Sequence, residues 1–119
     1  MKILVALTIL AALPFGPAAG GERFACNMSA LTKAERARYQ EVAMTLLRAI
    51  TEKREISNGY EFRLPARALI IAAEWVSLER RCCPFFSFEL AQTRDGGPLW
   101  LRVTGSEGIK SFIRAEFGL

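Results

Sequence analysis

Apolar and polar positions along the chain follow two different periods, and they predict the order helix, hairpin, helix, hairpin, helix. The first helix is expected over about residues 32–53. Thr32 and Glu35 form the sequence signature of a capping box, in which each residue caps a backbone N–H group of the other. The apolar residues that follow recur at steps of three and four, as on one face of a helix: Tyr39, Val42, Leu46, Leu47 and Ile50.

Two later segments alternate apolar and polar residues, which predicts strands joined in hairpins. In the first hairpin, over residues 54–65, Asn58-Gly59 is the expected turn, and Tyr60, Phe62 and Leu64 form the buried face of the returning strand. In the second hairpin, residues 95–97 (Asp-Gly-Gly) are the expected turn. Its inward positions are Phe86, Phe88 and Leu90 on one strand and Leu99, Leu101 and Val103 on the other.

Helices are expected on either side of the second hairpin. The helix over about residues 66–82 has an apolar stripe that includes Trp75 and ends at Cys82. Pro84 disfavours helical geometry at Cys83, so this helix should stop there. The last helix begins near Ser106 and ends at Gly118, a residue typical of helix C-termini.

This order lacks the long crossovers that parallel strands need. It predicts an α+β fold in which two hairpins form a small antiparallel sheet and three helices pack on one face of it. Trp75 and Trp100 are both expected between the helices and the sheet.

The first twenty residues have the layout of a secretory signal peptide. Lys2 gives a positive start, residues 3–15 are almost entirely apolar, and small residues precede Gly20, where cleavage is expected. The run is short for a transmembrane helix, which needs roughly 20 apolar residues. We therefore predict a signal peptide at 1–20, one α+β domain at 21–119 and a periplasmic or secreted protein without a stable membrane span. An uncleaved N-terminal anchor is the alternative.

Composition excludes several kinds of chemistry. The chain is 51% hydrophobic and 24% charged, which is typical of a globular domain, and it contains no histidine. Catalytic triads and metal sites that depend on histidine are therefore excluded. Removal of Lys2 with the signal leaves a net charge of +3, from 15 basic and 12 acidic residues. That charge is small and scattered, so we expect no nucleic-acid partner.

The three cysteines carry the candidate chemistry. Cys82 and Cys83 are adjacent at the end of the second helix, and Cys26 lies in the segment before the first helix. In an oxidising compartment Cys26 is expected to form a disulfide with Cys82 or Cys83, because neighbouring cysteines seldom bond to each other. The odd number of cysteines leaves at least one thiol.

A soft metal or metalloid is the alternative partner of these sulfurs. Two or three thiolates suit Hg, As, Cu, Zn or Cd, and Glu79 is placed on the helix so that its carboxylate can reach either Cys82 or Cys83. The C-terminal end of a helix disfavours a thiolate, so no strongly lowered thiol pKa is expected. The candidate metal ligands are Cys26, Glu79, Cys82 and Cys83.

The chain also resembles a set of small uncharacterised bacterial proteins. The likeness rests on CNMSALTKAERARY, NGYEFRLP, EWVSLERRCCPFFSFEL and LWLRVTGSEGIKSFI, and on a Glu-x-x-Cys-Cys-Pro-Phe core that begins at Glu79. Similar Cys-Cys-Phe modules accompany mercury-type metalloregulators, so the resemblance implies the handling of a soft metal. It implies no reaction and no catalytic residue.

The sequence suggests three candidate functions. The first is binding of a soft metal or metalloid by the vicinal cysteines. The second is a structural or partner-binding module held by a disulfide from Cys26. The third is thiol–disulfide exchange, which the absence of a Cys-x-x-Cys motif disfavours. No feature of the sequence predicts an enzyme.

Overall fold

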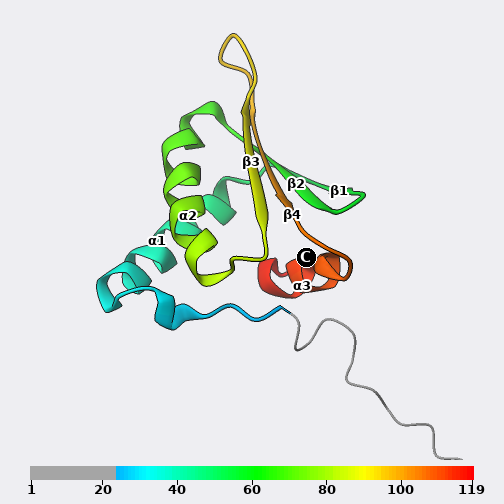
Figure 1. Cartoon of the computed structure of the whole chain (residues 1–119). Helices are drawn as coiled ribbons and strands as arrows, with labels where there is room; N and C mark the ends of the chain where they lie inside the picture. Colours follow the sequence, from blue (N-terminus) through cyan, green and yellow to red (C-terminus); the bar gives the residue numbers. More distant parts are fainter. Residues whose placement is uncertain (1–23) are drawn as a thin grey trace, which may run out of the picture.

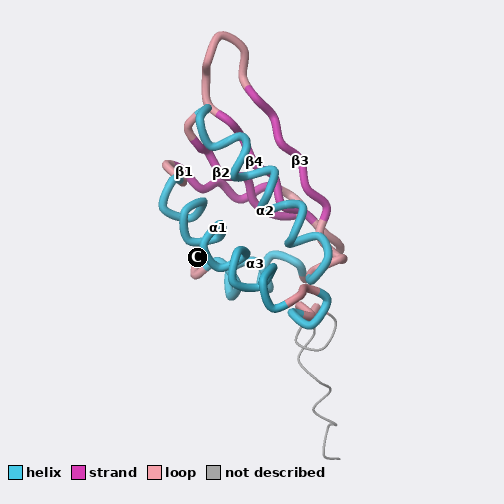
Figure 2. Tube along the Cα trace, turned by 90° about the vertical axis from the view of Figure 1, so that its left-hand side faces the viewer, coloured by secondary structure: helices cyan, strands magenta, loops and turns pink. Residues whose placement is uncertain are grey.

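The protein is an α+β domain, as predicted, in which three helices cover one face of a four-stranded antiparallel sheet (Figures 1 and 2). The computed structural model describes residues 24–119. The predicted signal peptide and its cleavage site lie outside the described residues. None of the described helices is both long enough and apolar enough to span a membrane.

The sheet has the strand order β1-β2-β4-β3, so the two hairpins meet along β2 and β4. The strands are β1 (Glu52–Ile56), β2 (Gly59–Leu64), β3 (Ser87–Gln92) and β4 (Leu99–Thr104). The predicted inward positions of β2 and β4 are confirmed, since all are buried: Tyr60, Phe62, Leu64, Leu99, Leu101 and Val103. The β3–β4 hairpin projects beyond the helices and turns at Asp95 and Gly96, both with positive φ (Figure 1).

The helices are α1 (Lys33–Ala49), α2 (Leu69–Cys82) and α3 (Ile109–Phe117), and short 3₁₀ helices precede α1 (Met28–Ala30) and α2 (Ala66–Ala68). The capping box is present: the Thr32 amide donates to Glu35 at 2.9 Å, and the Glu35 amide donates to Thr32 at 3.1 Å. Gly118 ends α3 in the left-handed conformation, as predicted.

Three of the expected element boundaries were wrong in detail. α1 ends at Ala49 and not near residue 53, because residues 52–56 pair with β2 and gain a ladder of backbone hydrogen bonds. The first turn consists of residues 57–58, while Gly59 is the first residue of β2 and pairs with both Ile56 and Thr104. α3 begins at Ile109, three residues after the expected start.

Trp75 lies in the core between α2 and the sheet, but Trp100 lies on the opposite face. The Arg54 guanidinium stacks 4.0 Å above the Trp100 ring. On the same face, Glu61 is paired with Arg54 at 3.1 Å and with Arg102 at 3.0 Å. Polar side chains therefore cover this face of the sheet, and the hydrophobic core lies on the other.

Candidate thiol and metal site

The two adjacent cysteines lie where α2 gives way to the turn before β3. Cys82 is the last residue of α2, and Cys83 leaves the helix with φ −126° and ψ 69°. The Cys83 amide still donates to the Glu79 carbonyl at 2.8 Å, and this bond satisfies one of the carbonyls of the last helical turn. Both cysteines are fully buried, and Pro84 follows them as the predicted stop.

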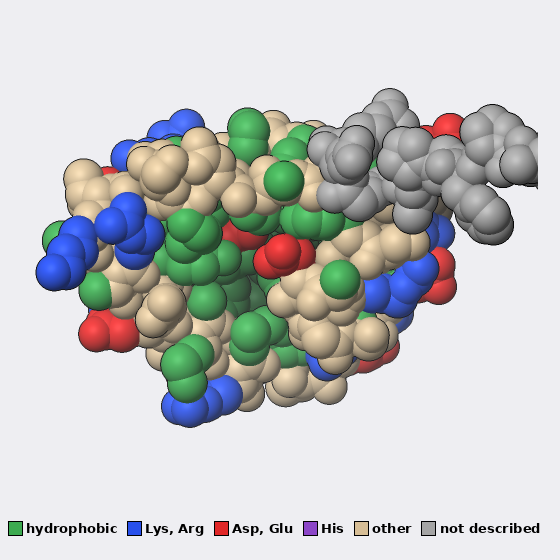
Figure 3. Space-filling model, turned by 90° about the horizontal axis from the view of Figure 1, so that it is seen from below, with side chains coloured by type: hydrophobic (Ala, Val, Ile, Leu, Met, Phe, Trp, Pro, Cys, Tyr) green, Lys and Arg blue, Asp and Glu red, His purple; other side chains and the backbone are tan. Residues whose placement is uncertain are grey.

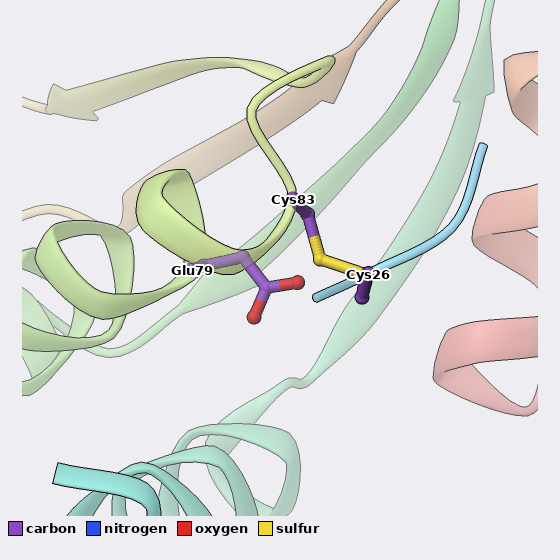
Figure 4. Close-up of side chains that lie close together, drawn as sticks. All are labelled: Cys26, Glu79 and Cys83. Atoms are coloured by element: carbon purple, nitrogen blue, oxygen red, sulfur yellow. A yellow bond between two sulfur atoms is a disulfide. The ribbon is translucent and has the colours of Figure 1, made fainter. Parts of the chain in front are cut away.

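Cys26 forms a disulfide with Cys83 (Figure 4). This confirms that the N-terminal cysteine reaches the end of α2, and it decides between the two predicted pairings. Cys83 is free to turn toward Cys26 because it has left the helix. Cys82 remains helical, with its Sγ 3.5 Å from the Glu79 carbonyl oxygen, and it keeps its thiol.

The segment that carries Cys26 is also held by contacts that do not involve sulfur. The Asn27 amide donates to the Cys82 carbonyl at 2.7 Å. The Phe24 ring packs against Phe85 and Phe112, with ring centroids 5.2 and 6.0 Å apart. Further along, Arg81 on α2 donates to the Ala30 carbonyl at 3.0 Å. The segment is therefore anchored to α2 and α3 on both sides of Cys26.

Glu79 is the third group of the site, and its carboxylate points toward the disulfide (Figure 4). One ligand atom from each of Cys26, Glu79 and Cys83 can be chosen so that all three lie within 4.8 Å of one another. The side chain is only 2% exposed, and its Oε2 has no hydrogen-bond partner among the described residues. A buried carboxylate oxygen without a partner is rare and unfavourable, so this position calls for an explanation.

Burial raises the pKa of Glu79 to about 7. The Tyr39 hydroxyl opposes this shift by hydrogen bonding to the carboxylate, and the negative charge of Glu116 adds to it. Burial also raises the pKa of Cys82 to about 11, with a further contribution from Glu79. The expected absence of a low thiol pKa therefore holds for Cys82, which is a thiol at neutral pH.

Three of the four predicted ligands thus converge with ligand atoms close together: Cys26, Glu79 and Cys83. Cys82 lies beside them, with its Sγ 3.8 Å from that of Cys83, but it is outside the closest group. While the disulfide is closed, neither of its sulfurs is a thiolate. Reduction would place two thiols and a carboxylate at one point, with a third thiol adjacent.

The sequence pointed to Glu79 by its spacing from the cysteines but gave no sign that it is buried. Two residues near it were not predicted as part of any site. Tyr39 was assigned only to the apolar stripe of the first helix, and its hydroxyl gives no signal in a hydrophobicity pattern. Glu116 comes from α3, and only the tertiary fold brings it near Glu79.

Comparison of the chain with protein-family models, with curated proteins and with solved structures found no match. The site is therefore interpreted from its own geometry.

Proposed function

We propose that this protein binds a thiophilic metal cation or metalloid in its reduced form, and that the Cys26–Cys83 disulfide is the closed form of the same site. The observation that carries the proposal is the buried Glu79 carboxylate beside the two sulfurs, whose Oε2 has no hydrogen-bond partner among the described residues. A disulfide needs no such group, whereas a cation bound between the sulfurs would neutralise and coordinate it.

Opening the site is a two-electron step. A dithiol reductant supplies two electrons and two protons, the bond between Cys26 and Cys83 breaks to give two thiols, and the reductant becomes a disulfide. A soft cation then displaces the thiol protons as it binds, so thiol pKa values need not be low beforehand.

The non-covalent anchors favour binding after reduction. The Asn27 amide, the Phe24 ring and Arg81 hold the N-terminal segment without help from the disulfide. Cys26 and Cys83 should therefore remain near each other, and little ordering entropy has to be lost when a cation joins them. Cys82 is the nearest additional sulfur for a cation that prefers three thiolates.

Cd(II) titration of the reduced protein tests the proposal. Free-thiol counts in denaturant should first give one thiol per oxidised chain and three per reduced chain. One Cd(II) should then bind per reduced chain, with the thiolate charge-transfer absorption as the readout. The Cys26→Ser/Cys83→Ser variant should bind at least a hundredfold more weakly, and Glu79→Gln about tenfold more weakly.

The control is Glu107→Gln, which removes an exposed carboxylate and should leave Cd(II) affinity unchanged. The proposal is wrong if the reduced protein binds Cd(II) no more tightly than the variant that lacks Cys26 and Cys83.

A structural clamp is the second candidate, and the observed disulfide itself favours it. In that case the bond only ties the N-terminal segment to the end of α2, and reduction lowers stability without creating a metal site. A disulfide persists in oxidising compartments, which supports the proposed export to the periplasm or exterior. Thiol–disulfide exchange is the weakest candidate. The raised pKa of Cys82 makes this thiol, which lies next to the disulfide, a poor nucleophile.

A further inference from the structure

A cavity of about 90 Å³ opens between α1, α2, α3 and the helix-covered face of the sheet. Its walls are mainly apolar and aromatic, and two acidic residues, Glu79 and Glu116, also line it. The space-filling view shows a hollow with hydrophobic walls and acidic atoms beside it (Figure 3). The residues that matter for its chemistry are Tyr39, Phe62, Trp75, Glu79, Glu116 and Phe117.

The polar groups of the cavity are acceptors of hydrogen bonds or carry negative charge. Glu79 is 98% buried, given its 2% exposure, and its Oε2 lacks a partner among the described residues. Glu116, from α3, also lines the cavity, and its charge acts on Glu79. The described lining contains no lysine or arginine. Such a cavity repels anions and favours a cation that can donate hydrogen bonds.

The aromatic walls restrict the kind of cation. The Trp75 and Phe117 rings lie 5.8 Å apart, and both line the cavity. Aromatic faces attract organic cations, and apolar walls suit an alkyl chain. A hard metal ion such as Ca²⁺ requires about six to eight oxygen ligands, which two carboxylates and one phenol do not provide. The volume, about that of three water molecules in the liquid, accommodates an ammonium group with its first one or two carbon atoms, and the rest of a short chain would extend through the opening of the cavity.

We propose that this cavity binds the ammonium group of a short primary alkylamine between Glu79 and Glu116, with Tyr39 as a further acceptor and the aromatic rings around the chain. This function goes beyond metal binding. It applies to the oxidised protein, in which Cys26 and Cys83 are bonded to each other and cannot hold a metal.

The experiment uses the oxidised Trp100→Phe protein, whose remaining tryptophan is Trp75 in the cavity wall. Its fluorescence is followed while n-butylammonium or 1-butanol is added; the alcohol has a similar shape but no charge. We expect a saturable change with butylammonium and at least tenfold weaker binding of butanol, because the alcohol lacks charge-assisted hydrogen bonds.

Three variants in this background locate the site. Glu116→Gln, on the surface of α3, should weaken butylammonium binding about tenfold, and Glu79→Gln should weaken it at least as much. Ala43→Leu should weaken it by filling the cavity, which Ala43 lines. Glu107→Gln removes an exposed carboxylate elsewhere and should have no effect.

The inference is overturned if butylammonium gives no saturable change, if butanol binds equally well, or if both glutamine variants at Glu79 and Glu116 bind as tightly as the parent. Ordered water alone would then fill the cavity. Because the disulfide stays closed throughout, this result is separate from that of the Cd(II) titration: failure of either experiment leaves the other intact.

Discussion

At the scale of single residues, Glu79 is the side chain whose environment departs most from what its sequence position indicates. It lies on a helix four residues before Cys83, where a solvent-exposed carboxylate would be ordinary, yet it is buried beside the disulfide. The surroundings only partly compensate for this burial. Burial raises the pKa of Glu79 by more than the hydrogen bond from the Tyr39 hydroxyl lowers it. Glu79 is therefore expected to lower the stability of the oxidised protein, which is characteristic of a group retained for binding.

The pH dependence of stability tests this expectation. A carboxyl group whose pKa rises from 4.5 unfolded to about 7 folded is more easily protonated in the folded state. The free-energy penalty of burying its charged form is absent below about pH 4.5, grows as the pH rises from there to about 7, and is complete above about pH 7. Glu79→Gln should therefore stabilise the oxidised protein at pH 8 by on the order of 2–3 kcal/mol and change stability little at pH 4.5.

Urea denaturation of both proteins at pH 4.5, 6 and 8 measures this difference. Carboxylates with lowered pKa, such as that of Glu35 beside Arg81, contribute a slope of the opposite sign. They are present in both proteins and cancel in the comparison. Equal unfolding free energies of wild type and variant at every pH would show that the burial of Glu79 does not destabilise the protein.

The buried Cys82 thiol gives a second prediction at this scale. Its exposure is 0% and its pKa is raised to about 11, so the thiolate is scarce and inaccessible. Iodoacetamide should modify the native oxidised protein at pH 8 at least a hundredfold more slowly than the same protein in denaturant. Mass spectrometry of the alkylated chain measures the rate. Rapid modification of the native protein would mean that the end of α2 opens readily.

At the scale of elements, Gly59 was predicted as a turn residue, but the fold needs it as the first residue of a strand. Asn-Gly is a strong turn signal, but Gly59 lies within β2 and not at a turn position. A Cβ atom at this position would collide with the Val103 carbonyl oxygen and the Thr104 Cα atom of the adjacent strand. Glycine is therefore required by the close approach of β2 to β4.

Gly59→Ala should destabilise the protein by about 1–3 kcal/mol, because backbone atoms of β4 cannot move aside as a flexible side chain would. Ser57→Ala, at the exposed turn two residues earlier, is the matched control and should change stability by less than about 0.5 kcal/mol. Thermal unfolding of the three proteins gives the comparison. A Gly59→Ala variant as stable as the control would refute the close-packing explanation.

Local signals allowed most of the elements to be predicted. The capping box at Thr32, the stop at Pro84 and the alternation in β2 and β4 depend only on nearby residues, and the structure confirms each of them. The end of α1 could not be predicted from residues 50–53 themselves, because pairing with β2 decides it. The predicted placement of Trp100 went against a local signal: it lies between the inward Leu99 and Leu101, so alternation puts its side chain on the other, polar face, where it is opposite Arg63.

The candidate site was predictable only in part. The vicinal cysteines, the reach of Cys26 and the proximity of Glu79 followed from helix geometry and cysteine number. The choice of Cys83 over Cys82 depends on the backbone angles where α2 ends, which Pro84 influences but does not fix. The cavity joins side chains from α1, α2, α3 and the sheet, and no local pattern encodes such a set.

At the scale of the whole molecule, the fold places the N-terminal segment against the far end of α2, 57 residues along the chain. Helices α1 and α2, both hairpin strands β1 and β2, and their connections all lie between the two bonded cysteines. The disulfide therefore closes a loop that includes half of the structure, and it restricts the unfolded chain much more than a local bond would. The same segment also packs directly on α2 and α3 through Phe24 and Asn27.

These two kinds of attachment have separable effects, and the Cys26→Ser/Cys83→Ser variant separates them. A loop of this length predicts a loss of about 4 kcal/mol in unfolding free energy, from the greater freedom of the unfolded chain. The native position of the segment should nevertheless persist, because its hydrogen bond to the Cys82 carbonyl and its ring contacts do not require sulfur.

Hydrogen exchange measures both effects at once: the most protected core amides report the global loss, while the Asn27 amide reports local release. Protection of Asn27 should fall by no more than the global loss requires. A larger fall, with the core still protected, would mean that the disulfide alone positions Cys26, and the reduced site would then lack the pre-organisation on which metal binding depends.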